Sequence, residues 1–323
     1  MALWASRNEL TEESLSEVTI FCIEEPEAHL HPHQQRKLAE YLNSSLKGQV
    51  LITSHSPQIA SEFSPNSIIR LFNTNGESKA ASNGCSEIID NAFNDFGYRM
   101  SIIPAEAFFA NVVFLVEGPS EEIMYKTLAK SLKIDLDRLN ISILMVDGIG
   151  FGTYIKILDS LDIQWVLRTD NDIFKVPKKD EYRFAGVQRC IKYYKEYFKS
   201  DTDTEKVLLS NESNLRWANR VTPTPENISA ADNISKELIF YNMYISNKDL
   251  ENDLFDSPMK KELKEFFADY DEDEIVKVMQ SHKATFMYQF LKEKKDKLSA
   301  LKDDDIAKPL YACKEIIDSN ETD

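Results

Sequence analysis

The sequence has few cysteines, no long apolar segment and no signal for export. Its four cysteines lie far apart and form no CxxC pair, which argues against a zinc site and against a disulfide framework. No run of about eighteen apolar residues occurs, and the N-terminus has neither a basic start nor an apolar signal core. We therefore expect a cytoplasmic protein that does not use a membrane as a partner.

Positive charge is also scarce. The 38 basic residues are outnumbered by 54 acidic residues, which gives a formal net charge of -16. Such a surface does not attract polyanions as a whole, so contact with nucleic acid requires a local basic patch or a bound metal ion. With 323 residues, of which 42% are hydrophobic, the chain is long enough for two domains that each bury a core.

The most informative segment runs from Asn111 to Glu122, NVVFLVEGPSEE. Its apolar, β-branched run predicts a buried strand, which Gly118 and Pro119 end before a helix begins at Ser120. Glu117 then stands at the carboxyl end of a strand and Glu121 in the first turn of the next helix. Open α/β sheets carry their functional residues at this place.

Two later segments repeat this pattern. A strand that begins near Ile163 ends in Asp170 and Asp172, and a strand-like run from Leu238 precedes a third group of acids, which comprises Asp249, Glu251 and Asp253. Carboxylates that converge on one sheet edge repel one another unless divalent cations lie between them. The pattern favours Mg²⁺ or Mn²⁺ ligands, although each acid taken alone also suits a helix cap or a solvated loop.

The first hundred residues have a different pattern. An apolar strand over residues 17–25 ends in Glu24 and Glu25, and a second strand over residues 49–53 is followed by His55. Paired acids and a neighbouring histidine suit an ATP site, where they orient Mg²⁺, polarise the attacking water and sense the γ-phosphate. The three histidines of HLHPH could share one face of an extended segment and bind metal, but contacts within a loop suit them better.

This half resembles the Walker B strand, D-loop and switch-histidine strand of ABC-type ATPases. The resemblance implies a metal-associated role for Glu24, a catalytic role for Glu25 and a switch role for His55. No GxxxxGK[ST] motif is present. We expect the chain to be the C-terminal part of a longer protein and to hydrolyse no ATP usefully by itself; robust turnover would refute this.

Residues 174–199 reverse the global charge directly after the strand that ends in Asp170 and Asp172. A basic segment beside a metal site suits contact with a phosphate backbone, and a solvated amphipathic helix explains it equally well. The candidate DNA-contacting residues are Arg168, Lys175, Lys178, Lys179 and Arg183. Residues 200–233 are polar and predict a loop-rich segment, whereas the last ninety residues predict helices.

The strand that ends in Glu-Gly and the later strand that ends in Asp-x-Asp resemble the Toprim domain of topoisomerases, primases and certain nucleases. Together with YISNKDLENDL, the segments VFLVEGPSEEIMYKTL and RTDND resemble the Toprim half of OLD-family (overcoming lysogenization defect) nucleases of the Gabija type. This resemblance alone singles out Lys283, in QSHKATFMYQF, as a catalytic lysine. It also implies a role in antiphage defence and a helicase-like partner of the UvrD type.

The predicted fold is α/β: the C-terminal part of an ABC-type ATPase domain over residues 1–103, then a Toprim domain over residues 104–323 with a parallel sheet and a helical extension. The predicted function is a metal-dependent DNA endonuclease or nickase that forms a homo-oligomer and is regulated by ATP in the full-length protein. Two cations held by Glu117, Glu121, Asp170, Asp172, Asp249 and Glu251 would clamp the phosphodiester, with Glu117, Asp170 and Lys283 as catalytic residues. The alternative is a nucleotide-gated DNA-binding scaffold with a non-catalytic Toprim domain. A primase-like or topoisomerase-like enzyme is disfavoured because no zinc ribbon or polymerisation module is visible.

Overall fold

The computed structural model describes residues 20–46, 48–64, 67–74, 76–81, 105–146, 150–199, 201–218 and 221–322. The chain divides into two compact units. The first comprises the residues up to Phe109 together with Ser160–Asp162, and the second comprises Ala110–Asp159 and Ile163–Asp323. No helix within the described ranges is both long and apolar enough to cross a membrane.

The first unit contains the two predicted strands, and they pair in parallel. β1 (Ile20–Glu24) pairs with β2 (Gln49–Thr53), and the register places Glu24 beside Thr53. α2 (Pro32–Ser44) connects them, and α3 (Pro57–Ala60) follows, capped by the Ser56 side chain. An antiparallel hairpin of β3 (Leu71–Thr74) and β4 (Glu77–Ala80) comes next, and a 3-10 turn spans Ala105–Phe109.

The second unit is built on a four-stranded, fully parallel sheet with the order β11-β7-β5-β6. The strands are β5 (Val112–Val116), β6 (Ile141–Met145), β7 (Gln164–Thr169) and β11 (Met243–Ile245). Every residue of β5 is buried, as its β-branched run predicted, and the Phe114 ring meets Tyr125 edge-on with centroids 4.7 Å apart. The predicted parallel α/β architecture is confirmed.

Helices flank this sheet. α5 (Pro119–Ser131) follows β5 and packs on α13 (Lys283–Lys294), α6 (Phe151–Ser160) leads to β7, and α14 (Lys308–Thr322) packs on β5 and β7. The other C-terminal helices are α10 (Leu250–Asp256), α11 (Lys260–Phe266) and α12 (Glu272–Ser281). Helices were predicted for this region, and they share one apolar cluster with the sheet.

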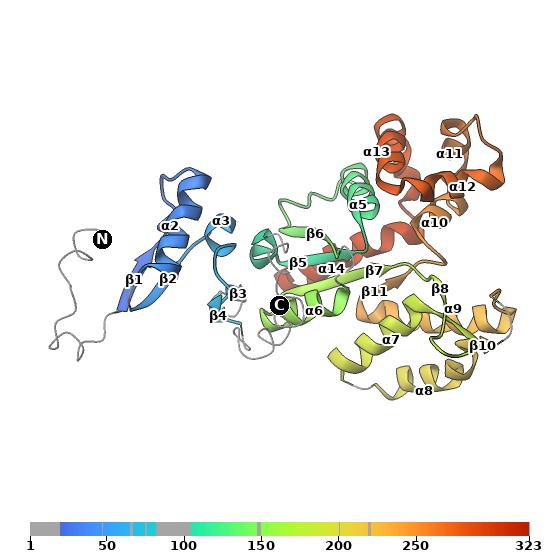
Figure 1. The fold of residues 1–323 in the computed structure, drawn as a ribbon, viewed down its shortest axis with the longest axis horizontal. Coiled ribbons are helices and arrows are strands. Elements are labelled where there is room, and N and C mark those ends of the chain that lie inside the picture. The colour runs from blue at the N-terminus through green and yellow to red at the C-terminus, as the bar shows by residue number, and fades with distance from the viewer. Residues whose placement is uncertain are drawn as a thin grey trace. The chain divides into compact units, whose positions relative to one another are not determined.

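Residues 173–238 form a second group of elements. The short antiparallel strands β8 (Ile173–Lys175), β9 (Glu181–Phe184) and β10 (Arg216–Ala218) pack with α7 (Ala185–Tyr197), α8 (Thr202–Asn211) and α9 (Pro225–Leu238). Figure 1 shows β7 ending between α10 to α13 on one side and α7 to α9 on the other. The active-site candidates gather at this end of the sheet.

Two sequence-based expectations about this region are wrong. The polar segment 200–233 is mostly helical, because Asp201 and Thr224 accept hydrogen bonds as helix N-caps and start α8 and α9. The strand-like run from Leu238 is a strand only over Met243–Ile245, since Leu238 ends α9 and Asn242 takes a left-handed conformation with φ 60°.

Candidate active site

Glu117 and Asp170 lie side by side because they follow the neighbouring parallel strands β5 and β7. Glu117 Oε1 accepts hydrogen bonds from the Asp170 amide at 3.1 Å and from Thr169 Oγ1 at 2.6 Å. The same oxygen is 2.5 Å from Nη1 of Arg189, which lies on α7. The first two predicted acid groups therefore meet at one edge of the sheet.

Asp170 is the most strongly perturbed acid of this cluster. The residue is 6% exposed, and burial, followed by repulsion from Glu121 and Glu117, raises its pKa to about 8. Its Oδ1 atom is buried without a hydrogen-bond partner. Asp172 stands at the surface, where partial burial and the charges of Glu117 and Asp249 raise its pKa.

The backbone beside Asp170 leaves no room for a side chain. A Cβ atom added to Gly186, in the first turn of α7, would lie 2.4 Å from the Asp170 carbonyl oxygen. The Ala185 amide donates to the Asp172 carbonyl at 2.9 Å, so α7 begins directly against the Asp170–Asp172 segment. The glycine thus permits the close approach of α7 to the acids.

Glu121 and Glu251 connect α5 to α10. Burial raises the pKa of Glu121, which is 3% exposed in the first turn of α5. Ser120 Oγ, in the same turn, donates to Oε1 of Glu251 at 3.2 Å, and Glu251 is 1% exposed. The third acid group therefore reaches the site through Glu251.

The other two acids of this group, Asp249 and Asp253, have hydrogen-bonding partners outside the cluster. Asp249 caps the helix, accepting from the Asn252 amide at 2.9 Å, and its second oxygen accepts from Gln280 Nε2 at 2.5 Å. Asp253 Oδ2 is 2.5 Å from Nη2 of Arg168. Asp249 is therefore a helix cap, which is the alternative that the sequence left open for these acids. Its charge also raises the pKa of Asp172.

Lys283 lies inside the cluster. It begins α13, and its Nζ atom is 3.1 Å from Oε2 of Glu251 and 3.5 Å from Oδ2 of Asp170. Burial disfavours the charged ammonium, but the carboxylates of Glu251 and Asp170 outweigh this effect and raise the pKa of Lys283. The side chain that only the family resemblance singled out is thus a cation held between two predicted metal ligands.

The cluster fits a hard divalent cation by its chemistry. Its donors are carboxylate oxygens, which Mg²⁺ and Mn²⁺ prefer, and the buried Asp170 Oδ1 has no protein partner. In the arrangement described, no three His, Cys, Asp or Glu side chains among the described residues are grouped closely enough to hold an ion. Two basic side chains, Lys283 and Arg189, contact the acids directly.

Arg189 and Thr169 are site residues that the motif analysis did not single out. Arg189 also contacts Thr169 Oγ1, and its guanidinium lies 5.7 Å from the centroid of the Phe151 ring. The only sequence signal for this arginine was its place in the basic segment after Asp172, which gave no reason to choose it over its neighbours.

The burial of Arg168 contradicts its prediction as a DNA-contacting residue. It is 4% exposed, pairs with Asp253 and lies over the Tyr125 ring at 5.8 Å, so it is not available to a DNA backbone. It joins β7 to α10 inside the core. A buried ion pair has little solvent around it, and breaking it leaves an uncompensated charge.

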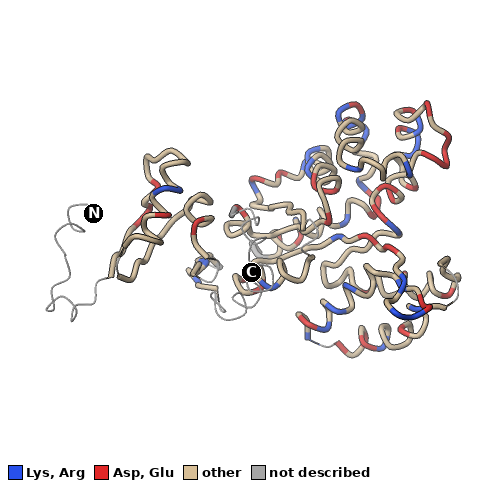
Figure 2. The backbone as a smooth tube through the Cα atoms, viewed as in Figure 1, with Lys and Arg blue, Asp and Glu red and all other residues tan. Residues whose placement is uncertain are grey.

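The remaining candidate DNA contacts lie around the β8–β9 turn (Figure 2). Lys175 pairs with Asp180 at 2.9 Å, and Lys178 has a left-handed backbone with φ 63°. Arg183 is half-buried and donates to Gln188 Oε1 at 3.2 Å, whereas Lys179 is exposed. Of these four basic residues, Lys178 and Lys179 are exposed and make no ion pair with the described residues.

The ATPase-like residues lie together at the ends of β1 and β2. His55 Nε2 is 3.7 Å from Oε1 of Glu25, whose backbone has φ 40°. Glu27, which the motif analysis did not select, accepts from Ser54 Oγ and from the His55 amide, both at 2.7 Å. It fixes the segment that carries the predicted switch histidine.

The histidines of HLHPH take local roles. His31 is the N-cap residue of α2, His29 has a left-handed backbone with φ 65°, and His33 Nδ1 is 2.7 Å from the Arg36 guanidinium. No metal-holding group forms among them in the described part of the chain.

The second unit has parallel strands that end in clustered acids, and the first unit has an ATPase-like strand pair. This is the arrangement expected of a Toprim domain that follows an ATPase-type segment in the sequence. Comparison with known families agrees. Residues 108–172 match the model of the overcoming lysogenization defect protein-like Toprim domain, and residues 2–60 match an AAA ATPase domain. The predicted resemblance to the OLD-family nucleases is thereby confirmed.

Individual relatives point the same way. The chain is 28% identical over 258 residues to the endonuclease GajA of Bacillus cereus (strain VD045), which covers 79% of this chain and 43% of that protein. It is 27% identical over 167 residues to the OLD nuclease of Thermus scotoductus (strain ATCC 700910 / SA-01), which covers 49% of this chain and 31% of that protein. The chain thus spans less than half the length of these curated relatives. Both of these relatives are named as nucleases.

Among solved structures, the C-terminal region of the Burkholderia pseudomallei OLD protein matches with a TM-score of 0.39 and 19% identity. That match covers 65% of this chain and 99% of the other.

Proposed function

We propose that the second unit is the catalytic centre of a metal-dependent DNA endonuclease or nickase. The observation that carries the proposal is the contact of Lys283 with both Asp170 and Glu251 at the edge of the sheet. A scaffold has no need of a half-buried lysine held between two carboxylates, whereas phosphodiester hydrolysis uses both a cation and metal ligands. The nuclease relatives support the same reaction.

The residues that would hold Mg²⁺ or Mn²⁺ are Glu117, Glu121, Asp170 and Glu251, with Asp172 and Asp249 at the periphery. Bound divalent cations at such a site supply an activated water and stabilise the charge on the leaving oxygen. Lys283 Nζ would stabilise negative charge on a non-bridging phosphate oxygen. The Asp170 carboxyl, with its pKa near 8, must release its proton before it can act as a ligand.

The first unit would couple nucleotide binding in the full-length protein to this centre. Glu24, Glu25 and His55 would take the metal-associated, catalytic and switch roles, and Glu27 would position the His55 segment. An antiphage function, self-assembly, a helicase-like partner and a cytoplasmic location belong to the same proposal, and they rest on the resemblance to OLD-family nucleases of the Gabija type.

The test is nicking of supercoiled plasmid with Mg²⁺ or Mn²⁺ and without either. Lys283→Ala should lower the nicking rate about 100-fold or more, as does removal of one charge-stabilising donor in other enzymes. Lys292→Ala is the matched control, because Lys292 is exposed on the same helix. Glu117→Ala should abolish metal-dependent nicking.

Nicking that survives Lys283→Ala and Glu117→Ala in folded protein would contradict the proposal. DNA binding without cleavage under either metal would favour the nucleotide-gated scaffold.

A further inference from the structure

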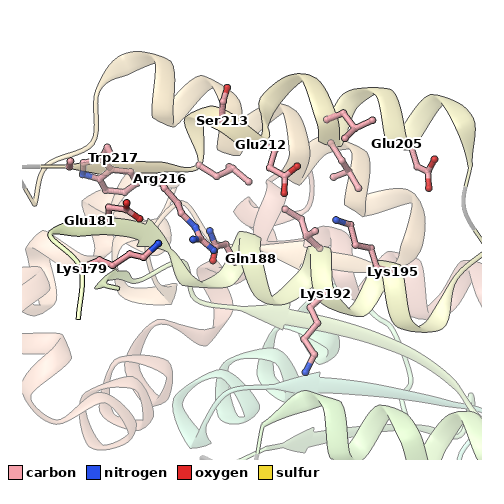
Figure 3. Close-up of a pocket in the computed structure, with 15 residues that line it drawn as sticks. Lys179, Glu181, Gln188, Lys192, Lys195, Glu205, Glu212, Ser213, Arg216 and Trp217 are labelled. Atoms are coloured by element: carbon pink, nitrogen blue, oxygen red, sulfur yellow. The ribbon is translucent and has the colours of Figure 1, made fainter. Parts of the chain in front are cut away.

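A groove of about 1010 Å³ lies beside the candidate active site, between α7, the β8–β10 sheet and α8. Nothing in the proposed catalysis uses it. Its volume is at the upper end of the range of small-ligand pockets, which is too small for a duplex but sufficient for part of a single strand. Figure 3 shows its lining residues.

The groove has walls of different character. Lys179, Lys195 and Arg216 line it from the β8–β9 turn, α7 and β10, and Figure 3 shows Lys179 and Arg216 extending towards Gln188. Glu205 and Glu212 line it from α8 and the turn that follows. Across the described ranges, these three cations have no carboxylate within ion-pair distance.

Apolar side chains form the rest of the lining. Ile191, Leu208 and Leu215 contribute to it, and Leu209 is 71% exposed. Glu181 adds an acid near Lys179, and Lys192 stands at the rim with its ammonium directed away from α8. The groove thus has cations on one side, apolar side chains in its floor and carboxylates on the other side. This arrangement is complementary to a single nucleic-acid strand. Such a strand offers phosphates along its backbone, apolar base faces and amino groups that donate to carboxylates.

Helix α7 connects this groove to the candidate active site. Its residue Arg189 contacts Glu117, whereas Gln188 and Lys195, seven residues apart and therefore on one face, line the groove. The two sites are separated by one helix, which is about 10 Å wide with its side chains. A strand that leaves the active site with its bases stacked spans that width with about three nucleotides, at roughly 3.4 Å each.

We propose that this groove binds the single-stranded segment of the nucleic-acid substrate that flanks the cleaved phosphodiester. The proposal rests on the proposed nuclease function and names the form of its substrate. The phosphates lie on Lys179, Lys195 and Arg216, and the bases face the apolar floor and Glu205 and Glu212. The two strands of a duplex cannot enter together, so the groove selects substrates with an unpaired flank.

The experiment measures binding of fluorescent DNA by anisotropy in EDTA, so that no cleavage occurs and the result is independent of the nuclease proposal. The probes are duplexes with single-stranded flanks of two or eight nucleotides, and a blunt duplex. The full chain is compared with Lys195→Glu/Arg216→Glu and with the milder Lys195→Gln/Arg216→Gln. Lys130→Glu, an exposed lysine on α5, is the matched control.

Wild-type protein should bind the eight-nucleotide flank more tightly than the two-nucleotide flank, and both double variants should lose this difference. Losing two phosphate contacts should reduce the slope of log K against log[salt] by about 1.4. Affinity for the blunt duplex should stay unchanged, as should all binding by Lys130→Glu.

Two results would overturn the proposal: an unchanged preference for the long flank in both double variants, or an equal loss of affinity for flanked and blunt DNA. Plasmid nicking by the same proteins is scored separately. Nicking without a flank preference would support the nuclease proposal and contradict the groove proposal. A flank preference without nicking would support the groove proposal and contradict the nuclease proposal.

Discussion

The burial of Asp170 predicts an unusual pH dependence of stability in the metal-free protein. A carboxyl with a pKa of about 8 in the folded state and an ordinary value of 3.8 binds its proton more tightly when the protein is folded. The folded state therefore holds more protons than the unfolded state between about pH 4 and pH 8, and the free energy of unfolding falls as pH rises through that window. Above about pH 8 this contribution becomes constant.

The magnitude follows from the linkage relation. One pH unit inside the window changes the free energy of unfolding by about 1.4 kcal/mol for one proton. From pH 5.5 to 7.5, Asp170 alone accounts for a loss of at most about 2.7 kcal/mol. For a unit of this size that loss lowers the melting temperature by roughly 5–10 °C. Asp170→Asn removes this contribution and keeps a neutral group of the same shape.

The assay is thermal unfolding in EDTA at pH 5.5, 6.5 and 7.5. The wild-type melting temperature should fall more steeply with pH than that of Asp170→Asn, and the two should converge at the lowest pH. Asp269→Asn, which changes an exposed acid on the same unit, controls for the shift in net charge and should follow the wild type. Added Mg²⁺ should stabilise the wild type most at pH 7.5, because the ligand must lose its proton.

Equal slopes for wild type and Asp170→Asn would refute the reasoning, since the Asp170 carboxyl would then titrate at similar pH in the folded and unfolded states.

Two further changes test how the site is held together. Arg168→Ala should lower the free energy of unfolding by about 3–5 kcal/mol, because it leaves Asp253 buried without its partner. The double variant Arg168→Met/Asp253→Leu should recover most of this loss when both proteins are unfolded in urea. A single variant as stable as the wild type would contradict the buried pair. Gly186→Ala should push α7 away from the Asp170 carbonyl. The free energy of unfolding should fall by about 1–3 kcal/mol in the same assay, and plasmid nicking should slow. Unchanged nicking and stability would show that the close contact is not needed.

The acids were predictable because strand ends are local signals. Glu117 and Asp170 each follow an apolar, β-branched run, and parallel pairing of such runs brings their ends together. Arg189 could not be chosen in this way, because its partner Glu117 lies 72 residues earlier in the chain. Lys283 had no local signal, and only the family resemblance identified it.

The wrong predictions have the same physical origin. Arg168 stands one residue before a site strand ends, and nothing nearby in the sequence shows that Asp253, 85 residues later, buries it. The polar residues of 200–233 were interpreted as a loop by composition, whereas Asp201 and Thr224 use that polarity to cap helices. Composition describes a segment's polarity but not which polar group starts a helix.

The two cations at the site explain how its acids can be assembled on one sheet edge. Several carboxylates at low exposure repel one another and lose hydration, which destabilises the folded state unless opposite charge is present. Arg189 supplies that charge to Glu117 from α7, and Lys283 supplies it to Asp170 and Glu251 from α13. These helices belong to the two groups that flank the end of β7 (Figure 1). An ion pair between one of these cations and a candidate metal ligand therefore links each group of helices to the end of the sheet. On the proposed function, a divalent cation would have to compete with these ion pairs, and its binding would free both basic side chains to contact a phosphodiester.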